Sequence, residues 1–305
     1  MSRTASTVNR LSDGDAPVAR PQRKKFDWAW IGVTPFFLYA ILFLFLPSAS
    51  IFIRSFQASD GSFTFQNIIN IFARSDILNA YKTSIGISLI TAIGGAVFGF
   101  LLAYAVVLGG LNTALRVFLL TFSGVASNFA GVPLAFAFIA TMGNAGLITR
   151  MLENVFNFDI HATGFTIYNM WGLSIVYMYF QFPLMVLIMA PALDGLRREW
   201  REACENLGGT YAQYWRYVAL PILLPTLLGT TILLFGNAFG AYATAYAFSG
   251  SFINLVTILI GAVIQGDVLY DPGLGNALAL GMILIMSLSM LGYAWTQRKA
   301  ARWSQ

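Results

Sequence analysis

The chain has 305 residues, of which 57% are hydrophobic and only 10% are charged, and its mean hydropathy is +0.69. This composition excludes a soluble globular domain and indicates an integral membrane protein. The net charge of +5 does not indicate nucleic-acid binding, because the basic residues cluster beside hydrophobic segments, as the positive-inside rule describes.

Cysteine and histidine are too scarce for redox or metal chemistry. The single cysteine, Cys204, excludes an internal disulfide, and one cysteine with one histidine cannot complete a zinc site. We therefore expect no metal ion. His161 is interpreted as a solvated loop residue rather than a ligand or a pH switch, and Cys204 as a small residue at a packed position.

The chain begins with a polar segment, residues 1–27, which ends in basic residues and predicts a disordered cytoplasmic tail. The apolar run that follows, Trp28–Ile53, is uncharged and long enough to cross a bilayer. No small-residue cleavage site follows a short apolar region, so we expect an uncleaved first span rather than a signal peptide.

Five further long apolar runs predict five more spans. They are Thr83–Val107, Val117–Met142, Thr166–Leu193, Ile222–Phe248 and Gly273–Trp295. The run Ile253–Gln265 has only thirteen residues, which favours a re-entrant or interfacial segment.

Glycine and proline inside these runs carry further expectations. Gly95 and Gly99 have the spacing that lets two helices approach closely, although glycine is common in membrane helices generally. Pro133, Pro183 and Pro225 lie within predicted spans, where they could act as hinges or, more simply, as static kinks.

Six spans place both termini on one side of the membrane. Fourteen of the eighteen Lys and Arg residues then lie on that side, together with the loop 194–221. The positive-inside rule predicts that this side is the cytoplasm. Residues 298–305 form the second cytoplasmic tail in this interpretation.

The loop 194–221 is the longest polar passage between two spans. Acidic residues at its start favour a short helix, Glu199–Leu207, which Gly208 and Gly209 end. A second amphipathic helix, Tyr211–Leu220, is expected to stop at Pro221. The simple alternative is a basic amphipathic helix lying on lipid headgroups.

The spacing of residues in this loop resembles the EAA loop of permease subunits in binding-protein-dependent ABC importers. Glu202, Ala203 and Cys204 are followed after three residues by Gly208, and after nine more by Val218–Pro221 (VALP). Cys204 stands where the family usually has Ala, and Val218 where it usually has Ile.

Two weaker segments resemble the same family, Gly61–Ile71 (GSFTFQNIINI) after the first span and Met142–Leu147 (MGNAGL) after the third. Taken with the six spans, the chain resembles a type I importer permease, and most of all the spermidine/putrescine transport permeases.

This resemblance implies an all-α membrane protein whose six-span permease domain covers residues 28–297, in the bacterial cytoplasmic (inner) membrane. It implies half of a translocation pathway for a small solute, with a polyamine as first choice and aminophosphonate, ferric ion, thiamine or sugar as alternatives. The implied partners are a second permease in a heterodimer, two ABC ATPase subunits and an extracytoplasmic substrate-binding protein.

The resemblance also assigns residues to the joint with the ATPase: Glu202, Ala203, Cys204, Gly208, Leu220 and Pro221. No glycine in the chain is followed by lysine, so a phosphate-binding loop is absent. We expect a transport subunit without enzymatic activity or cofactor, with ATP and magnesium on the separate ATPase.

Polar and aromatic side chains inside the predicted spans are candidates for lining the pathway: Asn128, Tyr177, Tyr179, Gln181, Asn237, Tyr242 and Tyr246. Their alternative role is hydrogen bonding between helices or at the membrane interface. Tyrosine rings could hold a cation by contacts of about 0.5–2 kcal/mol each.

Two other classes of function stay open. An ion-coupled carrier usually has charged residues within its spans, and the predicted spans lack them, although sodium sites built from backbone carbonyls are an exception. The other class is a membrane protein with a structural or assembly role and no transport.

Overall fold

The structure is a computed structural model that describes residues 29–58, 60–156, 166–265 and 270–301. Within these ranges the chain is helical apart from turns and one isolated β-bridge, Gln57 to Phe63. The chain divides into two units, Met1–Ser48 and Ala49–Gln305. The predicted tail 1–27 and His161 lie outside the described residues.

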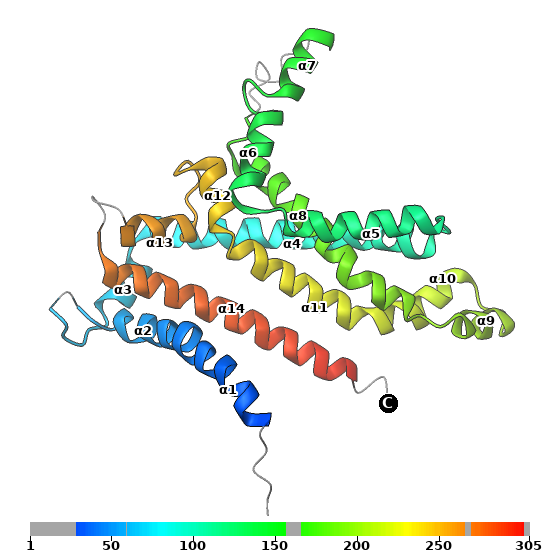
Figure 1. Cartoon of the computed structure of the whole chain (residues 1–305), viewed down its shortest axis with the longest axis horizontal. Coiled ribbons are helices and arrows are strands. Elements are labelled where there is room, and N and C mark those ends of the chain that lie inside the picture. Colours follow the sequence, from blue (N-terminus) through cyan, green and yellow to red (C-terminus); the bar gives the residue numbers. More distant parts are fainter. Residues whose placement is uncertain (1–28, 59, 157–165, 266–269, 302–305) are drawn as a thin grey trace, which may run out of the picture. The chain divides into compact units, whose positions relative to one another are not determined.

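The helices are labelled in Figure 1. In chain order they are α1 (Ala29–Ala40), the π-helical segment η1 (Ile41–Phe45), α2 (Leu46–Ser55), α3 (Gln66–Ala73), α4 (Ser75–Leu108), α5 (Thr113–Asn128), α6 (Gly131–Met142), α7 (Leu147–Phe156), α8 (Met170–Asp194), α9 (Arg198–Asn206), α10 (Tyr211–Tyr214), the π-helical segment η2 (Trp215–Ala219), α11 (Leu220–Phe239), α12 (Tyr242–Ser249), α13 (Val256–Gln265) and α14 (Pro272–Ala301).

Six helical stretches in the described ranges are long and apolar enough to cross a membrane. They are Gly32–Ser55, Ser75–Leu108, Gly131–Phe156, Met170–Asp194, Tyr211–Phe239 and Pro272–Trp295. The predicted all-α, six-span class is confirmed. The short apolar run is also a helix of its own, α13, with ten residues.

The first predicted span, Trp28–Ile53, is confirmed from Ala29 onward as the continuous helix α1–η1–α2. The wider turn η1 ends where the Leu46 N–H donates to the Ile41 carbonyl, five residues back, directly before Pro47. Proline lacks an N–H and clashes with the preceding helical turn. A π-helical turn at this point lets the helix pass the proline without ending.

The third predicted span, Val117–Met142, is wrong as a single helix. α5 ends at Asn128 and α6 begins at Gly131, whose φ of +74° is a conformation that glycine adopts without a steric penalty. Pro133 therefore lies in the first turn of α6, where its missing N–H is tolerated. The helix α7 extends this region into the predicted polar loop 143–165.

The fifth predicted span, Ile222–Phe248, is displaced toward the N-terminus. The helix runs from Tyr211 through η2 to Phe239, and α12 is a separate helix. Pro221 does not stop the preceding helix as predicted, because the Leu220 N–H donates to the Trp215 carbonyl five residues back. This repeats the arrangement before Pro47.

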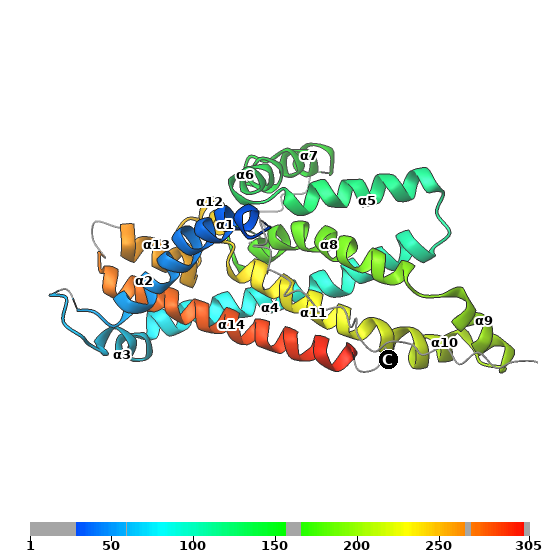
Figure 2. The same ribbon diagram turned by 60° about the horizontal axis from the view of Figure 1, so that its bottom comes forward.

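The centre of the second unit is the pair α4 and α8, the most extensive helix contact, and α11 packs against both (Figure 1, Figure 2). A Cβ built on Gly95 would lie 2.9 Å from the Gln181 Cβ, and one on Gly99 would lie 2.5 Å from the Met185 Cβ. The predicted close helix contact at these glycines is confirmed.

We expect Gly99→Ala to lower the free energy of unfolding by about 1–3 kcal/mol, because the added methyl group overfills a packed contact. Besides Met185, it would meet the Phe182 backbone oxygen at 3.0 Å. Thermal unfolding of the purified protein in detergent measures the effect. Gly124→Ala in α5 is the matched control, since a Cβ there meets no atom within 4 Å. Equal unfolding temperatures for both variants would contradict this packing.

Candidate functional site

The helix α9 in the loop 194–221 carries two ion pairs along its surface. Arg198 Nε lies 2.9 Å from Glu202 Oε1, and Arg201 Nε lies 2.8 Å from Glu205 Oε1. The hydrogen bond to Glu205 raises the pKa of the Arg201 guanidinium above its ordinary value. Such i,i+4 pairs support a helix weakly, and the predicted helix Glu199–Leu207 is confirmed to within a residue at each end.

A tight turn of two glycines ends α9, as predicted. Gly208 has a φ of +78°, and its N–H donates to the Glu205 carbonyl at 2.9 Å. The Gly209 N–H donates to the Cys204 carbonyl at 2.9 Å, and a Cβ on Gly209 would lie 2.6 Å from the Cys204 Sγ. Position 208 therefore favours glycine for its backbone conformation, and position 209 favours it for space.

The second helix of the loop starts with a capping box. The Gln213 N–H donates to Thr210 Oγ1 at 3.3 Å, and the Thr210 N–H donates to Gln213 Oε1 at 2.7 Å. These reciprocal bonds satisfy N–H groups that a helix start leaves open. The turn and the cap together fix how α9 leads into the helix from Tyr211.

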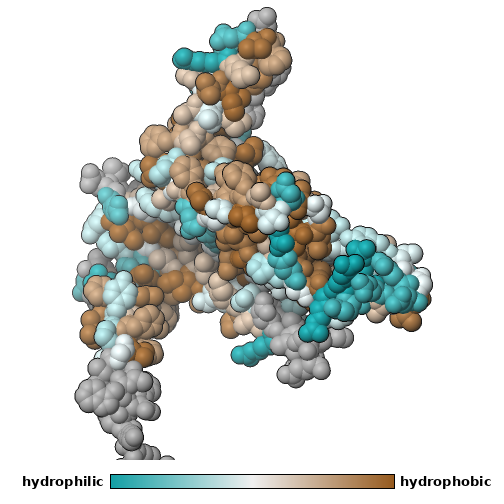
Figure 3. All heavy atoms as spheres, turned by 45° about the vertical axis from the view of Figure 1, so that its right-hand side comes forward, coloured by the Kyte–Doolittle hydropathy of each residue, from teal (hydrophilic) through white to brown (hydrophobic). Residues whose placement is uncertain are grey.

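The motif residues lie at the surface of this loop. Glu202, Ala203, Gly208, Leu220 and Pro221 are exposed, and Cys204 is half-buried. Hydrophilic residues gather over the end of the molecule that carries α9 and α10 (Figure 3).

Sequence reasoning missed Leu207, whose 90% exposure makes it the most exposed large apolar residue in the described ranges. It directly follows α9 and precedes the glycine turn. A lone leucine between a charged helix and two glycines was the available signal.

Side chains from α4 and α5 contact the loop at its start and in its second helix. The Arg116 guanidinium, in α5, lies 2.5 Å from the Asp194 carboxylate at the end of α8. The Tyr104 hydroxyl, in α4, lies 2.8 Å from the Tyr211 hydroxyl, and the Tyr104 ring packs edge-on against Trp215. No local pattern predicts these pairs, because their partners are far apart along the chain.

The predicted pathway residues Tyr177 and Gln181 are buried on α8. The Tyr177 hydroxyl donates to the Ala241 carbonyl at 2.9 Å, where the chain bends between α11 and α12. Gln181 Nε2 donates to Thr91 Oγ1 at 2.8 Å, while its Oε1 is buried without a hydrogen-bond partner in the described ranges.

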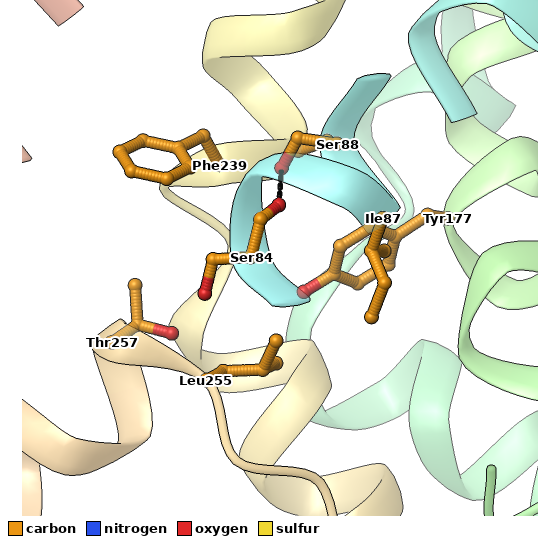
Figure 4. A pocket seen from close by; sticks show the side chains of 8 residues that line it. Ser84, Ile87, Ser88, Tyr177, Phe239, Leu255 and Thr257 are labelled. Carbon is orange, nitrogen blue, oxygen red and sulfur yellow. Dashed lines mark hydrogen bonds between the residues drawn. The ribbon is translucent and has the colours of Figure 1, made fainter. Parts of the chain in front are cut away.

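Tyr177 also faces a small polar cavity that Ser84, Ser88 and Thr257 line (Figure 4). Its volume is about 10 Å³, room for one water molecule at most. The Val256 N–H donates to the Ser84 hydroxyl at 2.9 Å at its edge. The hydrogen bonds around this cavity join the ends of neighbouring helices. The cavity itself is too small for a solute.

The other predicted pathway residues lie nearer the surface. Asn128, Asn237, Tyr242 and Tyr246 are exposed, and Tyr179 is half-buried. The rings of Tyr242 and Tyr246 stack with centroids 5.5 Å apart. Tyr242 borders a shallow hollow of about 280 Å³ along α13, next to Gly261 and Gln265.

No cluster of three or more His, Cys, Asp or Glu side chains that could hold a metal ion occurs in the described ranges. Within α9, Glu202 and Glu205 are each paired with an arginine.

Comparisons with known proteins agree with the fold. The family model described as "Binding-protein-dependent transport system inner membrane component" matches residues 95–302. The sulfate transport system permease protein CysT of Salmonella typhimurium is 25% identical over 263 residues, covering 83% of this chain and 86% of that protein. A ferric transport system permease protein of Haemophilus influenzae is 23% identical over 261 residues, covering 85% of this chain and 40% of that protein.

A solved structure of a bacterial alginate ABC transporter, in complex with an alginate pentasaccharide-bound periplasmic protein, has a chain of similar fold. Its TM-score is 0.69, with 92% of this chain and 96% of that chain covered at 14% identity.

Proposed function

The chain belongs to the family of binding-protein-dependent transport system inner membrane components, and on that premise we propose that its loop 194–221 docks with the ATPase of an ABC importer. The protein is a multi-pass inner membrane permease subunit. Its ATPase is a separate partner.

The observation that carries the coupling proposal is the exposed end of α9. Leu207 is 90% exposed and stands beside the charged residues of the helix. An apolar side chain surrounded by polar ones is typical of an anchor in a protein interface. Leu207 would enter an apolar pocket of the ATPase, with Glu202 and Ala203 on the adjoining surface and Gly208 holding the turn rigid.

Leu220 and Pro221 have a different part in this proposal. They follow η2 at the start of α11, where the helix continues into the membrane span. We infer that they keep the loop helix and the span in one line. The loop and both termini would face the cytoplasm, as the distribution of basic residues favours.

The pathway is proposed to lie between this chain and a second permease. The cavity beside Tyr177 holds about 10 Å³, which is far too little for a solute to pass inside this chain. Asn128 and Asn237 are exposed polar residues near helix ends, and polar side chains avoid lipid tails. Their surfaces fit a wet interface, with Tyr242 and Tyr246 as its aromatic part.

A small oxyanion of the sulfate class is the proposed substrate. The Salmonella relative is a sulfate permease and the Haemophilus relative a ferric one, so a polyamine finds no support among these relatives. Between Tyr217 and Gly266 there is no carboxylate to pair with a cation. Ferric ion is the second candidate, and an extracytoplasmic binding protein would select between them.

Uptake by proteoliposomes that contain the assembled importer and its binding protein tests the substrate. We expect ATP-dependent accumulation of labelled sulfate, with spermidine and chelated ferric ion at the level measured without ATP. Uptake of spermidine in place of sulfate would contradict the proposal and restore the polyamine prediction.

We expect Leu207→Ser to weaken ATPase binding by about 10-fold or more, because it removes an apolar anchor. Co-purification of the ATPase with the permease in mild detergent, titrated with free ATPase, measures the loss. Phe252→Ser is the matched control, since Phe252 is 87% exposed in the connection between α12 and α13. Retention of the ATPase at its normal level in Leu207→Ser would argue against the docking surface.

We expect Gly208→Val to reduce transport several-fold while the protein still inserts into the membrane. A β-branched residue is strained at the φ of +78° found at Gly208, so the turn and the direction of α9 would change. Gly208→Asn is the control, because asparagine tolerates this conformation and a Cβ there meets no atom within 4 Å. Undiminished transport by Gly208→Val would show that the coupling assignment is wrong.

A further inference from the structure

The loop 194–221 contacts one pair of neighbouring helices at two points, at its start and just after its glycine turn. α4 ends at Leu108 and α5 begins at Thr113, so a short turn connects them. Arg116 of α5 pairs with Asp194, where the loop begins. Tyr104 of α4 bonds to Tyr211, the first residue after the loop's glycine turn and cap.

A line of contacts also leads from α9 into α4. The Arg201 guanidinium lies 5.8 Å from the centre of the Tyr211 ring, a cation–π distance. The Tyr211 and Tyr104 hydroxyls are 2.8 Å apart. Arg201 belongs to α9 and Tyr104 to the last turns of α4, so three residues link the loop helix to a span.

Trp215 reinforces this link from the second helix of the loop. Its ring packs against Tyr104, with centroids 5.3 Å apart, and against Phe100, with centroids 6.5 Å apart. The indole Nε1 is buried without a hydrogen-bond partner in the described ranges. Trp215 opens the π-helical segment η2, so the aromatic contact sits where the helix geometry changes.

We propose that these two contacts form a clamp that makes the α4–α5 hairpin move with the loop 194–221. The inference rests on the proposed coupling function and adds a route for the motion. A push on α9 would otherwise be taken up by bending at Gly195 or at the glycine turn. When the contacts Arg116–Asp194 and Tyr104–Tyr211 are formed, a displacement of α9 also displaces α4. Because α4 packs along α8, the displacement is passed on to the spans.

The two contacts are partly exposed and contribute little to the stability of the fold. The side chains of Arg116 and Asp194 are 34% and 48% exposed, and exposed ion pairs add little to the free energy of unfolding. Two tyrosine hydroxyls that meet near the surface contribute little as well. We therefore assign the two contacts a different role, which is to fix the direction of the loop relative to α4 and α5.

The test measures whether ATP still moves α4 when the clamp is open. Spin labels on Phe72→Cys, in α3 directly before α4, and Leu147→Cys, in α7, report one distance in a Cys204→Ala background, whose own ATP-induced change in distance is the reference; both label sites are well exposed. The assembled complex with its ATPase is compared without nucleotide and with trapped ATP. We expect Arg116→Asp and Tyr104→Phe each to reduce the ATP-induced change in distance at least twofold, with the ATPase still bound.

Rescue separates a clamp from a general structural role. The exchange Arg116→Asp with Asp194→Arg recreates the pair in reverse and should restore the change in distance. Tyr217→Phe is the control for Tyr104→Phe, since Tyr217 is a 67% exposed tyrosine of the same loop. A full change in distance in the single variants, or no recovery in the exchange, would overturn the clamp. Failure of the ATPase to bind the unaltered chain would instead overturn the coupling proposal.

Discussion

The structure depends on one constraint, that backbone N–H and C=O groups inside a bilayer must find partners within the protein. The chain breaks its helices at several points between α5 and α13, and polar side chains from distant helices take up the freed groups. Thr244 accepts from the Gly131 N–H at 2.8 Å, Tyr177 donates to the Ala241 carbonyl and Ser84 accepts from the Val256 N–H. The buried polar residues of α4, α8 and α12 therefore hold the short helices in place.

The same constraint explains which structural elements the sequence predicts correctly and which it does not. The loop helix, its glycine turn and the close approach at Gly99 follow from local rules, and the structure has all three. The third and fifth spans were placed wrongly, because hydropathy does not register a break at Gly131 or Gly240. Each break is stabilised by a residue far along the chain, 113 positions away for Gly131 and Thr244.

The candidate site divides in the same way. Glu202, Ala203 and Gly208 are predicted through their resemblance to the family's EAA loop, since a motif is a local pattern. Leu207 was missed because only its exposure in the folded chain marks it. The pairs made by Tyr104 and Arg116 join residues 107 and 78 positions apart. A pattern within one segment of the sequence therefore cannot predict them.

The continuity of helix at Pro221 has a mechanical consequence. The stretch Tyr211–Phe239 has 29 residues, about 43 Å of rod at 1.5 Å per residue. Because the π-helical turn keeps the rod whole, the helix has no break at Pro221 where a displacement of its loop end could be lost before it reaches the part that packs against α4 and α8.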